Sequence, residues 1–188
     1  LRKDGITYPW VKEKLIKRYE DWKIVAEIFE NLVLEPFNEG YLKVVEKTGD
    51  DGLVATPSSD ASSPMHLIQK TFFNPTDFYI YYRERSEDLN AFADSVSNYF
   101  KQLISIIAAS PVEVVSWGGN YDATITFPPY FKNEILPWLN RAASVCSEKG
   151  KYLITHCDGE NQGLMEMIRD SGIVAAESVC PYPMTRLK

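Results

Sequence analysis

Apolar residues recur at steps of three and four along much of the chain, which is the pattern of helices that bury one face. The pattern predicts helices over residues 11–29, 35–47, 65–73, 86–110, 128–149 and 161–171. Ser86 is expected to cap the long fourth helix, and Pro111 to end it. In the second helix, the residues expected to point inward are Phe37, Tyr41, Val44 and Val45.

Short apolar runs lie between these helices, at residues 53–56, 112–117, 151–155 and 173–177. Continuous apolar runs of this length are typical of parallel strands that are buried on both faces. In the second half of the chain, strands and helices alternate, and such connections are right-handed crossovers within one sheet. We therefore expect an α/β fold in which these strands are parallel neighbours in one curved sheet.

Two architectures satisfy this pattern, a doubly wound sheet and a (β/α)8 barrel. A complete barrel needs about 250 residues, and this chain has 188. The chain also ends where a further helix is expected to begin. We expect one domain over residues 1–188 that forms part of a TIM (β/α)8-type barrel, with its other strands outside this chain. Open strand edges favour pairing with another chain, which predicts a homodimer.

The charge of the chain argues against some partners. Twenty Lys and Arg residues against 26 Asp and Glu give a formal net charge of −6, so there is no basic surface to predict nucleic-acid binding. No stretch reaches the roughly 18 uninterrupted apolar residues of a membrane span, and the N-terminal residues lack the apolar core of a signal peptide. Three widely spaced cysteines without a CxxC pair favour a reducing, cytoplasmic location.

Polar residues follow each predicted strand, where parallel α/β folds bind their ligands. They are Ser58, Ser59, Asp60 and His66 after the first strand, Trp117, Asn120 and Asp122 after the second, His156, Cys157 and Asp158 after the third, and Glu177 and Cys180 after the fourth. We expect His156, Asp158 and Glu177 to converge at one end of the sheet.

The run His156-Cys157-Asp158-Gly159 is the densest of these clusters. Because side chains alternate along a strand, His156 and Asp158 are expected on one side, where Glu177 or Cys180 could add a third metal ligand. The alternative is structural. In that case Cys157 is a buried apolar residue, Asp158 caps the helix after Gly159, and His156 is a hydrogen-bonded polar residue.

The run at residues 117–122, WGGNYD, also has two interpretations. In one, its glycines serve only to let the chain turn sharply. In the other, their small size lets a planar ligand approach the backbone while Asn120 and Asp122 bind it. His66 lies near a predicted helix start, where a capping or solvated role is favoured over catalysis.

Three segments together resemble the uroporphyrinogen decarboxylase superfamily. They are DDGLVATPSSDASSPMHLIQKTF at 50–72, WGGNYDATITFPPYFKNEILPWL at 117–139 and KGKYLITHCDGENQGLMEMIRDSGIVAAESVCPYP at 149–183. The shared features are a loop from glycine to proline, a Pro-Pro-x-Phe helix start, a proline within that helix, an H-x-D-G strand end and a proline after the last strand. The resemblance implies a (β/α)8 barrel, of which this chain matches the middle and later part.

The superfamily has two main branches, cofactor-free tetrapyrrole decarboxylases and zinc-dependent methyltransferases that move a methyl group between a corrinoid and a thiol. Where the decarboxylases carry a tyrosine, this chain has Lys70, which argues against decarboxylation. The methyltransferases carry His-x-Cys, and this chain matches the histidine with His156 but has Asp158 at the second position.

The resemblance favours a methyltransferase that moves a methyl group between a corrinoid, or another methyl donor, and a thiol. It implies His156, Asp158 and Glu177 as catalytic residues, with zinc held by His156, Asp158 and Cys180. Trp117, Asn120 and Asp122 would shape the pocket for a small molecule or a corrinoid protein. The alternatives are a tetrapyrrole decarboxylase without a cofactor, and a barrel that binds a ligand without catalysis.

Overall fold

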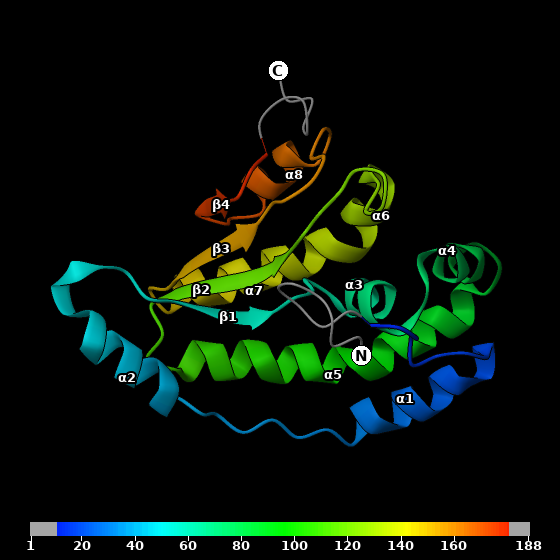
Figure 1. The fold of residues 1–188 in the computed structure, drawn as a ribbon, viewed down its shortest axis with the longest axis horizontal. Helices are drawn as coiled ribbons and strands as arrows, with labels where there is room; N and C mark the ends of the chain where they lie inside the picture. The colour runs from blue at the N-terminus through cyan, green and yellow to red at the C-terminus, as the bar shows by residue number, and fades with distance from the viewer. Residues whose placement is uncertain (1–10, 181–188) are drawn as a thin grey trace.

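The computed structural model describes residues 11–180. At its centre is a sheet of four parallel strands in the order β1-β2-β3-β4 (Figure 1). The strands are β1 (Ala55–Ser59), β2 (Val114–Gly119), β3 (Tyr152–His156) and β4 (Ala175–Glu177). The predicted α/β class and the parallel neighbours are therefore confirmed. Each strand begins and ends within three residues of its predicted bounds.

Helices precede the first strand and connect the strands that follow. They are α1 (Trp22–Glu30), α2 (Glu39–Thr48), α3 (Pro64–Leu67), α4 (Pro75–Glu84), α5 (Ser86–Ala109), α6 (Pro128–Tyr130), α7 (Leu136–Glu148) and α8 (Met165–Asp170), with shorter helical turns η1 (Tyr19–Asp21), η2 (Gly49–Asp51), η3 (Ile68–Phe72) and η4 (Phe131–Ile135). Within residues 11–180, no helix is long and apolar enough to cross a membrane.

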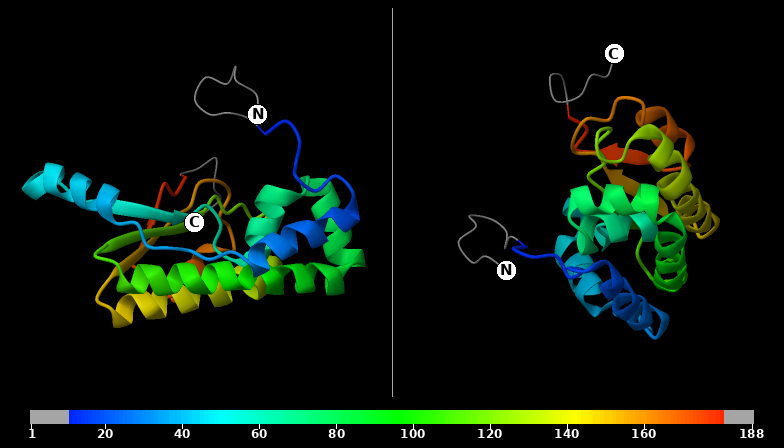
Figure 2. Two further views of the ribbon diagram at one scale, coloured as in Figure 1. Left: turned by 90° about the horizontal axis from the view of Figure 1, so that it is seen from below. Right: turned by 90° about the vertical axis from the view of Figure 1, so that its right-hand side faces the viewer.

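The core lies between the sheet and the long helices. Helices α5 and α7 run along one face of the sheet, and α1 packs against α5 (Figures 1 and 2). Phe100 of α5 is fully buried and its ring lies 5.9 Å from that of Trp117 in β2. The apolar stripe predicted for α5 therefore forms the centre of the core.

The sheet has one covered face and one face that the described residues leave more open. Along β3, Leu153 and Thr155 are buried, whereas Tyr152, Ile154 and His156 between them are exposed or half-buried. The prediction of strands buried on both faces is therefore not met for β3 within residues 11–180. This alternation places His156 on the open face.

The N-terminal predictions need correction. Residues 11–18 are not helical, and α1 begins only at Trp22. Helix α2 forms where expected but has no buried residue, and Phe37 before it is 78% exposed. Phe37, Val44 and Val45 are therefore exposed rather than inward, whereas Tyr41 is half-buried and packs against the core, as predicted.

Two smaller corrections concern helix boundaries. Ser86 is the first residue of α5 rather than its cap, a position that Arg85 takes. The last predicted helix is shorter than expected and starts at Met165. The proline-containing segment after β4 and the N-terminal residues 1–10 lie outside the described residues.

Candidate functional site

A pocket of ≈ 270 Å³ opens at the carboxyl ends of the parallel strands. This is the edge at which α/β folds of this kind bind ligands. The residues that line it are Pro57, Ser59, Asp60, Lys70, Ser116, Gly118, Gly119, Asn120, His156 and Glu177. Three of the residues predicted for the site, Asn120, His156 and Glu177, are among them.

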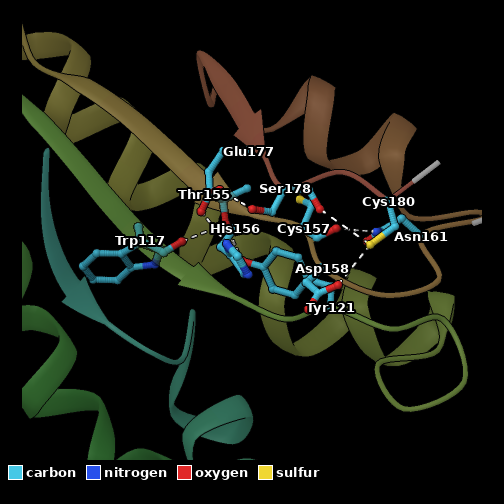
Figure 3. Close-up of polar contacts among 10 residues, drawn as sticks. All are labelled: Trp117, Tyr121, Thr155, His156, Cys157, Asp158, Asn161, Glu177, Ser178 and Cys180. Atoms are coloured by element: carbon cyan, nitrogen blue, oxygen red, sulfur yellow. Dashed lines mark hydrogen bonds and ion pairs between the residues drawn. The ribbon is translucent and has the colours of Figure 1, made fainter. Parts of the chain in front are cut away.

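Strand register brings His156 and Glu177 together. His156 is the register partner of Glu177 on one side and of Gly119 on the other. Its Nδ1 contacts Oε1 of Glu177, and the Ser178 hydroxyl donates to Oε2 of Glu177 over 2.5 Å (Figure 3). The hydrogen bonds from Ser178 and His156 lower the pKa of Glu177, so it is a carboxylate at neutral pH.

This contact fixes the imidazole tautomer. A carboxylate only accepts hydrogen bonds, so Nδ1 of His156 carries the hydrogen and donates it to Glu177. When the ring is neutral, Nε2 is then left with a free lone pair. The pair thus has the arrangement of a base oriented by a carboxylate.

The two glycines of β2 allow close approach within the fold. A Cβ at Gly118 would lie 1.7 Å from Oγ of Ser62, and a Cβ at Gly119 would lie 2.7 Å from Cβ of His156. Both have positive φ, 64° and 153°. Asn120, also at positive φ, donates its backbone N–H to the carbonyl of His156 over 3.1 Å. The glycines are therefore required by neighbouring protein atoms, which agrees with the structural interpretation of this run.

Trp117 belongs to a buried polar network rather than to the pocket. Its indole N–H donates to the carbonyl of Ser62 over 3.2 Å. The hydroxyl of Tyr121 contacts that of Ser62 and lies 3.0 Å from that of Thr155. Thr155 in turn donates to the carbonyl of Trp117 over 2.8 Å. Burial raises the pKa of Tyr121, so the phenol stays neutral.

Asp122 also has a local partner. Its carboxylate accepts from the backbone N–H of Thr124 over 2.8 Å, and its backbone carbonyl accepts from Ile125 and Thr126. It organises the loop after β2 and does not line the pocket.

Asp158 lies apart from His156. Its Oδ1 accepts a hydrogen bond from Sγ of Cys180 over 3.0 Å (Figure 3), and neither residue lines the pocket. Cys157 between His156 and Asp158 is fully buried, and burial raises the pKa of its thiol to about 12. Of the three residues predicted to converge, the structure thus brings together His156 and Glu177.

The described residues do not fit the expected zinc ion. Among residues 11–180, no group of three or more His, Cys, Asp or Glu side chains could hold a metal. Zinc binds cysteine as the thiolate, yet the hydrogen bond to Asp158 raises the pKa of Cys180. The residues expected to hold zinc are instead divided between two pairs, His156–Glu177 and Asp158–Cys180.

His66 is buried and neutral. Its backbone N–H donates to the capping hydroxyl of Ser63, and its Nδ1 accepts from the backbone N–H of Ser62 over 3.2 Å. Burial lowers its pKa to about 3. His66 therefore takes part in a helix start, as expected, but it is not solvated.

Lys70 and Asp60 complete the lining of the pocket. Asp60 follows the first strand and is among the polar residues found from the sequence. Lys70 was noted only for its difference from a family pattern. It belongs to the helical segment η3 rather than to a strand end, so the strand pattern carries no signal for it.

Comparisons with known proteins show the fold. No protein-family model matches the sequence, and no curated protein matches it. A solved structure, a methyltransferase from Methanosarcina mazei, is similar with a TM-score of 0.52 at 13% sequence identity. The match covers 82% of this chain and 40% of that one, so this chain spans less than half of the methyltransferase.

Proposed function

We propose that this chain is part of a methyltransferase of the uroporphyrinogen decarboxylase superfamily, built on a (β/α)8 barrel to which it contributes the four described strands. The parallel order of these strands supports the barrel. The likeness in fold to a protein named as a methyltransferase supports the reaction class. The observation that carries the proposal is the His156–Glu177 pair in the pocket at the carboxyl ends of the strands.

The proposed reaction moves a methyl group from a corrinoid or another methyl donor to a thiol. Nε2 of His156 takes the proton of the thiol, and the electron pair of the S–H bond stays on sulfur. The thiolate attacks the methyl carbon, whose bond to the donor breaks with both electrons leaving on the donor. Glu177 stabilises the imidazolium that forms.

The other pocket residues bind and orient the acceptor in this proposal. Asn120 and the hydroxyls of Ser59 and Ser116 line the pocket and offer hydrogen bonds. Trp117 and Asp122 act indirectly, since the first supports β2 from the core and the second holds the following loop.

The test uses the full-length protein with methylcobalamin as donor and 2-mercaptoethanol as acceptor. Loss of the methylcobalamin absorbance and formation of the thioether measure transfer. Glu177→Gln keeps an acceptor for Nδ1 but removes the charge, so we expect kcat/KM to fall by about 10²-fold. Glu166→Gln is the matched control, because Glu166 is exposed on α8, and it should leave the rate unchanged.

Two results would overturn the proposal. One is the absence of methyl transfer from methylcobalamin to any thiol. The other is release of carbon dioxide from a bound tetrapyrrole without demethylation of the donor, which would place the protein in the decarboxylase branch.

A further inference from the structure

Lys70 reaches the pocket from η3, whereas Asp60 directly follows β1 and Glu177 is the last residue of β4. Its side chain is half-buried and donates one hydrogen bond, from Nζ to the backbone carbonyl of Asp60 over 2.5 Å. Within residues 11–180, no carboxylate lies within ion-pair distance of Lys70. Burial lowers the pKa of Lys70, and the carboxylate of Asp60 opposes this effect only in part.

A lysine in this setting has two roles open to it. It could be structural, tying η3 to the end of β1 through the Asp60 carbonyl. It could also be reactive, since an amine withdrawn from water and without an ion-pair partner is more often neutral and nucleophilic. The pocket favours the reactive role, because it also contains the His156–Glu177 pair.

We propose that Lys70 binds a small, neutral aldehyde or ketone covalently as an imine. The lone pair of Nζ attacks the carbonyl carbon, the carbonyl oxygen takes up a proton and Nζ gives one up, which forms a carbinolamine. The hydroxyl group then takes a second proton and leaves as water, while nitrogen forms the C=N bond. Each addition and loss of water needs polar groups beside the carbinolamine, and His156 and Glu177 line the same pocket as Lys70.

The lining of the pocket selects the carbonyl compound. Asp60 and Glu177 are carboxylates at the pocket, so they repel a carbonyl compound that carries a carboxylate or phosphate. The volume of ≈ 270 Å³ lies below the roughly 300–1,000 Å³ of sites for drug-sized ligands. A short neutral carbonyl compound meets both conditions.

The inference does not depend on methyl transfer, and its test uses neither a methyl donor nor a thiol. The full-length protein is incubated with propanal and sodium cyanoborohydride, which reduces an imine to a stable secondary amine. Peptide mass spectrometry then gives the rate of modification at each lysine. We expect modification at Lys70 to be at least about tenfold faster than at Lys14.

Lys14 is a matched internal control. It is also half-buried, its pKa is also lowered by burial, and its Nζ also donates to a backbone carbonyl, that of Lys70, over 2.5 Å. It lines a different pocket, which contains no histidine. A faster reaction at Lys70 therefore reports the surroundings of the amine rather than its burial.

Two further measurements sharpen the result. Glu177→Gln should slow the modification of Lys70 and leave that of Lys14 unchanged. Glyoxylate, an anionic aldehyde, should modify Lys70 more slowly than propanal does. In the wild-type protein, equal rates of modification at Lys70 and Lys14 would overturn the proposal. Faster modification of Lys70 by glyoxylate than by propanal would overturn the neutral class of ligand.

Discussion

Two polar groups occupy the same edge of the sheet and differ in almost every physical property. Thr155 belongs to a buried network with Ser62, Tyr121 and Trp117, whose members are neutral and hydrogen-bonded to one another. The next residue, His156, lies on the open face and pairs with Glu177 at side-chain exposures of 35% and 47%. One step along β3 thus separates a group that stabilises the fold from a group that lines the pocket.

The largest expected effect is on the buried side of this comparison, at Gly118. Gly118→Ala adds a Cβ that would lie 1.7 Å from Oγ of Ser62, at a φ of 64°. We expect the free energy of unfolding to fall by at least about 3 kcal/mol, measured by urea denaturation. Gly150→Ala is the control, because Gly150 has a similar φ of 67° but open space around it. It should cost about 1 kcal/mol, and equal losses would show that the contact with Ser62 is unimportant.

The second effect is the pH dependence from His66, next to the same network. The folded protein holds the pKa of His66 at about 3 against an ordinary value of 6.5. Below pH 6.5 the unfolded chain therefore binds a proton that the folded chain does not. The His66 contribution to stability is complete above pH 6.5 and falls by about 1.4 kcal/mol per pH unit as the pH drops toward 3.

Urea denaturation between pH 7 and pH 4.5 measures this slope. The wild-type chain should lose stability more steeply than His66→Gln, whose side chain does not titrate. Parallel curves for the two chains would mean that His66 is protonated in the folded protein.

The third effect concerns the phenol at the centre of the network. Tyr121→Phe leaves the hydroxyls of Ser62 and Thr155 without their shared partner. We expect a loss of about 1.5 kcal/mol that does not change with pH. Tyr152→Phe removes a hydroxyl from a residue that is 57% exposed and should have almost no effect. Similar losses in both variants would argue against the network.

The smallest expected effect on stability is at the exposed pair. Glu177→Gln should change the free energy of unfolding by less than about 0.5 kcal/mol, since exposed ion pairs contribute little. The lowered pKa of Glu177 means that this contribution is present at neutral pH and is lost as the pH falls through that pKa. In urea denaturation, the difference in stability between the wild-type chain and Glu177→Gln should therefore be smaller at pH 3 than at pH 7. A large loss at pH 7 would show that the pair stabilises the fold, as the buried network does.

Sequence patterns predicted the sheet well because its strands are short apolar runs between turn residues. The two middle strands were placed within two residues of β2 and β3 at each end. Periodicity was less informative at α2, where it predicted a helix but not its exposure. An apolar stripe shows that a helix has two faces, whereas burial depends on which other element lies against it. Within residues 11–180, Tyr41 is the residue of α2 that packs against the core, and no residue of the helix is fully buried.

The site was predictable to the extent that it follows strand ends. His156 and Glu177 end adjacent parallel strands, and the register pairs them. Asp158 lies beyond the last residue of β3, where strand alternation no longer sets the direction of a side chain, and it bonds to Cys180 instead. Lys70 was missed as a pocket residue because it comes from a helical segment, whose position over the sheet edge depends on tertiary packing.

Helix α2 has a consequence for the dynamics of the chain. Its ten residues include none that are buried, and Val33 and Leu53 on either side are 77% and 75% exposed. Isolated helices shorter than roughly 12–15 residues are marginal in water, and tertiary contacts within residues 11–180 add little to this one. Its backbone hydrogen bonds should therefore open without unfolding of the core. Amide hydrogens of residues 39–48 should exchange with solvent much faster than those of α5, and a protease should cut between α1 and β1 before it cuts elsewhere in the described chain.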